Sequence, residues 1–113
     1  MHWGQSIMEF YSPLYVGASV RHPEKVMRRL RKRSLMISAY VILLAAGEDL
    51  LEIYDARIFA QHFYRDQACV IVGIADNYEE AVELIVRITE ESLAARGDCE
   101  LKKYLLERMQ ERV

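Results

Sequence analysis

Residues 68–75, with the sequence ACVIVGIA, form an unbroken apolar run. Asp76 and Asn77 follow at once, and an amphipathic helical pattern begins at Tyr78. A strand without a polar face is expected to be covered on both sides, as in a parallel sheet flanked by helices. The pattern therefore predicts an α/β protein in which 68–75 is an inner strand.

Two helices are predicted after this strand. Asn77 and Glu80 have the spacing of a capping box, and Gly97 is suited to end a helix in the left-handed conformation. Apolar residues recur at helical spacing between them, at Ala81, Leu84, Ile85, Ile88 and Leu93. Asp98 can cap a last helix, whose apolar side is expected to hold Leu101, Tyr104, Leu105 and Met109.

The part of the chain before the apolar run predicts two more strand–helix pairs. Strands are expected over 14–18 and 35–46, and a helix with proline in its first turn over 22–33. A second helix is expected over 49–65, because Asp49 and Glu52 also have capping-box spacing. A hairpin over 53–64 is the competing interpretation, but no turn residue interrupts that segment.

The predicted fold is thus a small three-stranded, mainly parallel sheet flanked by helices, in the order βαβαβαα. The crossovers are expected to be right-handed, with strand order 2-1-3 or 1-2-3. A length of 113 residues indicates one domain, over 8–113, preceded by a loose segment at 1–7. Met8 is an alternative start.

Composition excludes several functional classes. Cys69 and Cys99 form no CxxC or Cys/His cluster, which argues against zinc and suits a reducing cytoplasm. The longest apolar runs are too short for a membrane helix, and no secretory signal is visible. No glycine-rich phosphate loop and no nucleophile–base constellation is present, so neither a cofactor nor a catalytic residue is predicted.

Several short pieces of the chain resemble a family of small bacterial proteins from anaerobic Firmicutes. The matching pieces are 11–17, 40–45, 50–53, 72–75 and 80–81. The resemblance spans 8–106 and implies a bacterial cytosolic protein. The family has no known function, so the resemblance brings no site residues to this chain.

The loops after the predicted strands offer a candidate ligand site. In an open parallel sheet, ligands bind beyond the carboxyl ends of the strands, where helix N-termini favour anions. The residues expected to gather there are Arg21, His22, Asp49, Asp76 and Asn77. The alternative is that His22, Asp49 and Asn77 merely cap their own helices. A few acids in separate loops do not indicate a metal site, so no metal is predicted.

Charge is distributed unevenly along the chain. Residues 1–33 hold seven Lys/Arg and two Asp/Glu, a balance of +5, and the remainder holds eight and fifteen, a balance of −7. Four of the basic residues share one face of the predicted helix and form a candidate nucleic-acid surface: Lys25, Arg28, Arg29 and Lys32. The acidic remainder and the lack of stacking aromatics argue against nucleic acid, and a solvated helix face is the simpler interpretation.

Association is the function expected first. A three-stranded sheet with apolar strands leaves edges that pairing would cover, so we expect a homodimer or an accessory subunit of an unidentified protein partner rather than an enzyme. A small anionic or nucleotide-like ligand at the strand ends is the second hypothesis. Docking on RNA or an acidic protein through 21–33 is the third.

Overall fold

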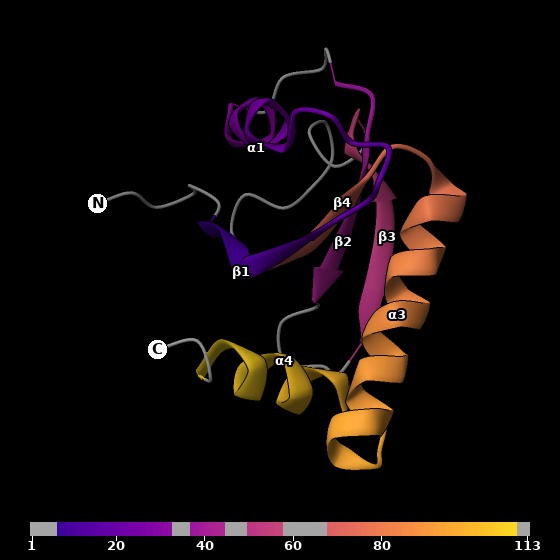
Figure 1. Cartoon of the computed structure of the whole chain (residues 1–113). Coiled ribbons are helices and arrows are strands. Elements are labelled where there is room, and N and C mark those ends of the chain that lie inside the picture. Colours follow the sequence, from indigo (N-terminus) through magenta and orange to yellow (C-terminus); the bar gives the residue numbers. More distant parts are fainter. Residues whose placement is uncertain (1–6, 33–36, 45–49, 58–67, 111–113) are drawn as a thin grey trace.

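The computed structural model describes residues 7–32, 37–44, 50–57 and 68–110 (Figure 1). These residues form an α/β fold with a four-stranded sheet in the order β1-β4-β2-β3. The elements, in chain order, are β1 (Ile7–Val16), α1 (Pro23–Arg31), β2 (Tyr40–Leu44), β3 (Leu51–Asp55), β4 (Ala68–Ala75), α3 (Tyr78–Arg96) and α4 (Leu101–Gln110). No described helix is long and apolar enough to cross a membrane.

The sheet is mixed, which corrects the prediction of three mainly parallel strands. β1 is parallel to β4, whereas β2 is antiparallel to both β4 and β3. The observed order is βαβββαα in place of βαβαβαα. The apolar character of β4 correctly predicted burial on both faces, but burial does not set the direction of the neighbouring strands.

The error arose at residues 51–55, which were predicted as part of a helix and form β3. Within Leu51-Glu52-Ile53-Tyr54-Asp55, apolar and polar side chains alternate only over the first three residues. Leu51 and Ile53 pack on the face that α3 covers, and Tyr54 packs on the opposite face. Each of these residues pairs antiparallel with one of Tyr40–Leu44. Those inter-strand bonds outweigh the capping-box signal of Asp49 and Glu52. The competing hairpin, placed over 53–64, overlaps β3 only at 53–55.

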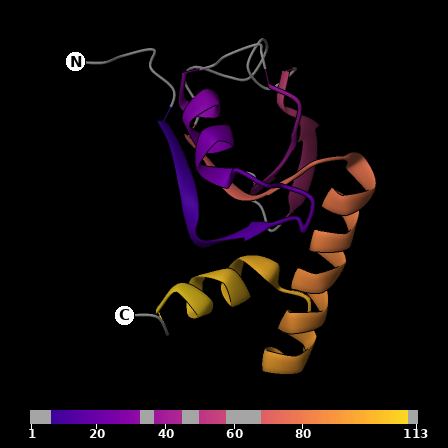
Figure 2. The ribbon, with the colours of Figure 1, turned by 45° about the horizontal axis from the view of Figure 1, so that its top comes forward.

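β4 lies between two packed layers, as predicted for an inner strand. Ile71 to Ala75 are buried, and β1 and β2 pair with β4 on either side. α1 covers one face of the sheet, with Leu30 in one apolar cluster with Ile71 and Ile74. α3 and α4 cover the other face, where their buried residues pack on Ile42, Val72 and Ala75 (Figures 1 and 2).

The remaining element predictions differ mostly at their ends. β1 covers 7–16 where 14–18 was predicted, and a cis bond between Ser12 and Pro13 lies in the part where its register with β4 shifts. β2 covers 40–44 of the predicted 35–46. α3 covers the predicted residues and ends at Gly97, whose φ of 79° is left-handed. Residues 1–6 lie outside the described part of the chain.

Candidate functional site

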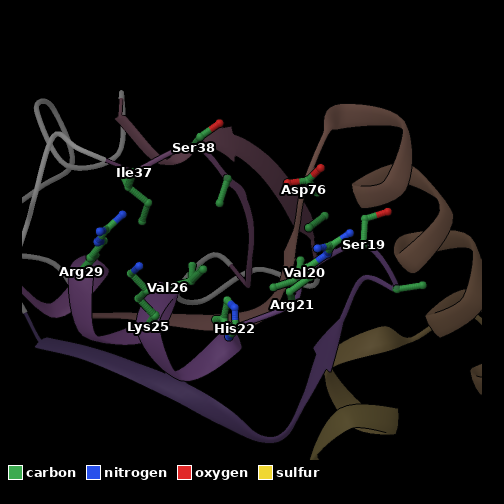
Figure 3. A pocket seen from close by; sticks show the side chains of 13 residues that line it. Ser19, Val20, Arg21, His22, Lys25, Val26, Arg29, Ile37, Ser38 and Asp76 are labelled. Carbon is green, nitrogen blue, oxygen red and sulfur yellow. The ribbon is translucent and has the colours of Figure 1, made fainter.

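A pocket of about 640 Å³ lies between α1, the loop after β1, the segment before β2 and the end of β4 (Figure 3). β1 and β4 are parallel, so their carboxyl ends meet at the same edge of the sheet. The chain then continues from each strand into a helix, α1 after β1 and α3 after β4. The pocket thus occupies the edge at which open α/β sheets bind ligands.

One wall of the pocket is basic. Lys25 and Arg29 are one helical turn apart on α1, and both line the pocket. Arg21 and His22, from the loop that leads into α1, line it as well. In Figure 3 the side chains of Lys25 and Arg29 extend from α1 toward the segment that carries Ser38.

The rest of the lining is apolar, with a few polar groups. Val20, Val26 and Ile37 contribute apolar surface, and Ser19 and Ser38 offer hydroxyl groups. Asp76 offers the one carboxylate in the part of the lining that the structure describes. Among the described lining residues, the basic side chains of Arg21 and Lys25 already outnumber the carboxylate of Asp76, which favours an anionic ligand.

The structure brings three of the five predicted ligand residues together. Arg21, His22 and Asp76 line the pocket, although they come from loops more than fifty residues apart. Asn77 does not line it: its Oδ1 accepts a hydrogen bond of 2.8 Å from the N–H of Glu80 and so caps α3. Asp49 lies outside the described residues.

Two details of the capping interpretation were wrong. His22 occupies the N-cap position of α1, but its side chain makes no capping hydrogen bond there. Because 51–55 form a strand, the third helix start expected near Asp49 is replaced by β3.

The predicted nucleic-acid surface divides between the pocket and the exterior. Lys25 and Arg29 line the pocket, whereas Arg28 and Lys32 do not line it and are exposed. The helical spacing had predicted that all four residues share one face of this helix. Helical spacing shows which residues share a face of α1. It does not show that residues 37–39 lie opposite only part of that face.

Glu80 also belongs to the site, although its capping-box spacing predicted only a role at the start of α3. Its carboxylate accepts hydrogen bonds from the N–H of Ser19 at 3.0 Å and from the N–H of Asp76 at 2.8 Å. It therefore joins the two loops that carry the pocket's polar groups. Burial raises the pKa of the Glu80 carboxyl group, but the two backbone hydrogen bonds outweigh burial and hold its pKa below the ordinary value. The capping-box spacing singled out Glu80 without revealing the contact to Ser19.

Gly17 makes room for this bridge. Gly17 is buried, and a β-carbon at this position would overlap the carboxyl group of Glu80. Any larger residue would therefore push the carboxylate away from Ser19 and Asp76.

We expect Gly17→Ala to destabilise the fold by about 1–3 kcal/mol, because two backbone N–H groups lose their acceptor. In a Glu80→Ala background the same change should cost much less, since the overlapping group is gone. Urea unfolding of the single and double variants measures this coupling. Glu79→Ala, an exposed neighbour on α3, is the control, and equal costs of Gly17→Ala in all backgrounds would contradict the bridge.

A second polar cluster joins β1 to the two C-terminal helices. The hydroxyl of Tyr15 donates to Glu91 Oε1 at 2.5 Å, and the hydroxyl of Tyr104 donates to the same oxygen at 2.9 Å. Arg108 donates to the carbonyl oxygen of Pro13 at 3.0 Å and lies over the ring of Tyr15. Burial, and then the hydrogen bond to Glu91, raises the pKa of Tyr15 far above its ordinary value. This cluster holds helices in place and lines no described pocket.

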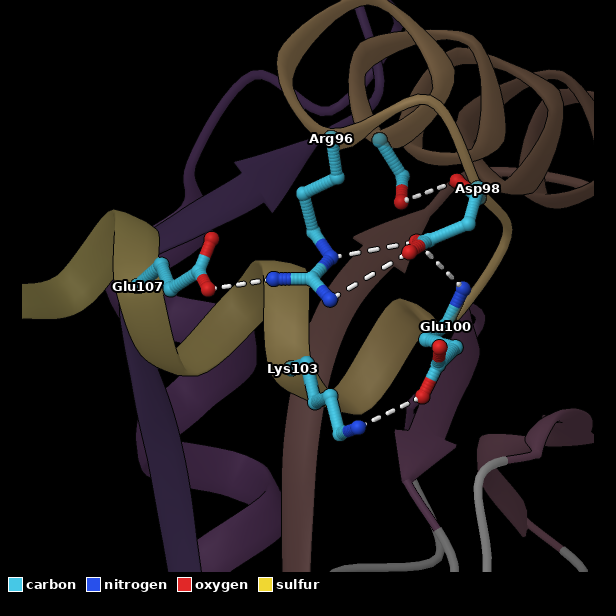
Figure 4. A network of polar contacts seen from close by, with 6 residues as sticks. Arg96, Asp98, Glu100, Lys103 and Glu107 are labelled. Carbon is cyan, nitrogen blue, oxygen red and sulfur yellow. Dashed lines mark hydrogen bonds and ion pairs between the residues drawn. The ribbon is translucent and has the colours of Figure 1, made fainter.

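A third polar network closes the turn between α3 and α4 (Figure 4). Arg96 bonds both Asp98, at 3.0 Å, and Glu107, and the buried hydroxyl of Ser92 donates to the carbonyl of Asp98 at 2.8 Å. These contacts fix the angle at which α4 leaves α3. Within the described residues, no three His, Cys, Asp or Glu side chains are grouped so that they could hold a metal ion.

Comparisons of the chain with protein-family models, with curated proteins and with solved structures find no match. The basic pocket is therefore the feature from which a function can be argued.

Proposed function

We propose that the protein binds a small phosphate-bearing ligand in the pocket beside α1. The observation that carries the proposal is the lining: Arg21, Lys25 and Arg29 line a cavity in which Asp76 supplies the one carboxylate among the described residues. Arginine and lysine are the side chains that bind phosphate oxygens most strongly. The volume of about 640 Å³ suits a ligand of metabolite size.

The other side of the pocket supports a ligand with more than a phosphate. Val20, Val26 and Ile37 give an apolar surface on which a ring or short carbon chain can lie. Asp76 and Ser19 lie together at one end of the pocket in Figure 3. A carboxylate and a hydroxyl there can accept hydrogen bonds from ligand hydroxyl groups. A phosphorylated sugar or nucleotide-like molecule combines these properties.

The bridge made by Glu80 supports this role by fixing the two loops in advance. Its bonds to the N–H groups of Ser19 and Asp76 hold both loops at a set separation before any ligand enters. Binding to such a preorganised site costs less conformational entropy than binding that must order the loops. Glu80 is thus a positioning residue of the proposed site.

The experiment compares Lys25 of α1 with Lys32, the residue that follows α1, because the two differ in their relation to the pocket. Lys25 lines it, whereas Lys32 is exposed beyond it. We expect Lys25→Gln to weaken the binding of ribose 5-phosphate about tenfold or more, since a charge-assisted contact is lost. Lys32→Gln should change the affinity about twofold or less, because an exposed charge beyond the pocket is screened.

Isothermal titration calorimetry of the wild type and both variants measures these affinities. Equal losses for both lysines would show that the basic face of α1 attracts anions in general, and would contradict a pocket site. A wild type that binds neither ribose 5-phosphate nor inorganic phosphate would contradict the proposal itself.

A further inference from the structure

Among the residues that the structure describes, β3 presents an open edge of the sheet. It is the outermost strand, and β2 is its only partner among the described residues. The N–H of Ala56 donates to the carbonyl of Ala39 at 2.9 Å, which sets the alternation along the strand pair. Glu52 and Tyr54 therefore direct their backbone groups toward β2, and the alternate residues direct theirs outward. The residues whose backbone N–H and C=O groups point away from β2 are Leu51, Ile53 and Asp55.

The flank of α3 next to this edge is apolar and exposed. The exposed side chains share one side of the helix: Tyr78 (56% exposed), Val82 (37%), Val86 (49%) and Leu93 (47%). The opposite flank of α3 faces β1, because Glu80 reaches Ser19 and Glu91 reaches Tyr15. The apolar flank therefore lies on the side of α3 away from β1, and Figure 1 shows α3 beside β3.

The open edge and the apolar flank form one continuous surface. The side chains of Leu51 and Ile53 pack in the same apolar cluster as α3, so they point to the face of the sheet that α3 covers. Both are only partly buried. The unpaired backbone N–H and C=O groups of β3 thus lie beside exposed apolar side chains of α3, and a partner could cover both at once.

We propose that a second copy of this chain covers this surface by antiparallel pairing of β3 with β3. A two-fold axis through Ile53 places Ile53 opposite its own copy and Leu51 opposite Asp55. Glu52 then lies opposite Tyr54, a combination that already interacts within one chain, where the Tyr54 hydroxyl donates to Glu52 at 3.0 Å. No like charges oppose each other, and opposed like charges would destabilise the pair.

The α3 flank is the reason to choose a second copy over another strand-forming partner. The same two-fold axis, perpendicular to the sheet, brings the second α3 to the same face. The two flanks then face each other across the joined β3 strands, and each covers apolar side chains of the other. An unrelated strand would satisfy the β3 backbone but would leave Val82 and Val86 in water. The surface is self-complementary, as a two-fold interface requires.

Two substitutions with equal exposure test the proposal. Val86 on the α3 flank and Leu106 on α4 are each 49% exposed, so lysine at either position should leave the fold intact. We expect a wild-type dimer by sedimentation equilibrium. Val86→Lys should weaken it at least about tenfold, because a charge would be buried at the interface. Leu106→Lys should leave the dimer unchanged.

A second variant tests the strand pairing separately. Ile53→Pro removes an N–H that faces outward, so the bonds to β2 remain and the dimer should be lost. Circular dichroism checks that each variant is folded. A wild type that stays monomeric over the whole concentration series would overturn the proposal. So would a dimer that survives Val86→Lys, or one that Leu106→Lys dissociates. The pocket lies on the other face of the sheet, so neither result bears on ligand binding.

Discussion

Raising the pH above about 10 is expected to destabilise the protein steeply. Tyr11 and Tyr15 are buried, with 5% and 2% of their surface exposed, and burial is the main cause that raises the pKa of each. The Tyr15 hydroxyl also donates a hydrogen bond to Glu91, which raises its pKa further. In the folded state both rings therefore keep their protons at a pH at which unfolded tyrosines lose theirs.

The sign follows from this difference in proton binding. The unfolded state binds fewer protons above about pH 10, so rising pH favours unfolding, and the stability is fully present only below that pH. Each retained proton lowers the free energy of unfolding by about 1.4 kcal/mol per pH unit. Tyr15 is expected to give a slope of about this size, and Tyr11, whose pKa is also raised, should make it steeper.

Urea unfolding at a series of pH values, with tyrosinate absorbance as a second signal, measures this slope. Tyr15→Phe should make the slope of the free energy of unfolding against pH shallower, because the contribution of Tyr15 is removed. It should also cost about 1 kcal/mol below pH 10, since the hydrogen bond to Glu91 is lost. Tyr78→Phe, at a ring that is 56% exposed, is the control. An unchanged slope in Tyr15→Phe would contradict the burial of the Tyr15 hydroxyl.

Leu105→Ala is expected to reduce the free energy of unfolding by about 2–5 kcal/mol. Leu105 is 1% exposed and packs in the apolar cluster between α4 and the sheet. Its carbonyl also accepts a hydrogen bond of 2.6 Å from the hydroxyl of Tyr11. Removing the Leu105 side chain leaves a cavity where α4 meets β1. It also weakens the hydrogen bond between the Tyr11 hydroxyl and the Leu105 carbonyl, which lies at the same place.

The adjacent residue provides the control for this prediction. Leu106 lies on the same helix but is 49% exposed, so Leu106→Ala makes the same chemical change outside the core. Its effect should stay within about 0.5 kcal/mol. Thermal or urea unfolding of both variants gives the comparison. Similar costs at the two positions would mean that α4 does not pack on the sheet as described.

The elements that several independent sequence features indicate could be predicted from sequence. α3 has a cap at Asn77, a helical apolar pattern and a left-handed Gly97, and the cap and the end were correctly predicted. The apolar pattern was correct for Ala81, Leu84 and Ile88, but Leu93, which was expected on the buried face, is 47% exposed. β4 is apolar along its whole length, and no other element explains such a run in the middle of a small domain. Residues 51–55 failed because five residues are too few for period 2 to outweigh a capping signal. The pairing with 40–44 that decides the outcome is not local.

The candidate site was predictable only in part, for a similar reason. Arg21, His22 and Asp76 could be assigned to one edge because they follow strands directly. Ser38 could not, since it precedes a strand whose antiparallel direction the sequence does not reveal. That reversal brings the start of β2 to the same edge as the end of β4. The contact between Glu80 and Ser19 depends in turn on the parallel pairing of β1 with β4.

Nuclear magnetic resonance of ¹⁵N-labelled protein titrated with ribose 5-phosphate tests the proposed ligand site most directly. Saturable shifts are predicted for backbone amides around the pocket, at Ser19, Arg21, Ser38 and Asp76. Shifts confined to the outer face of α1, at Arg28 and Lys32, would contradict a pocket site. An unchanged spectrum would contradict ligand binding altogether.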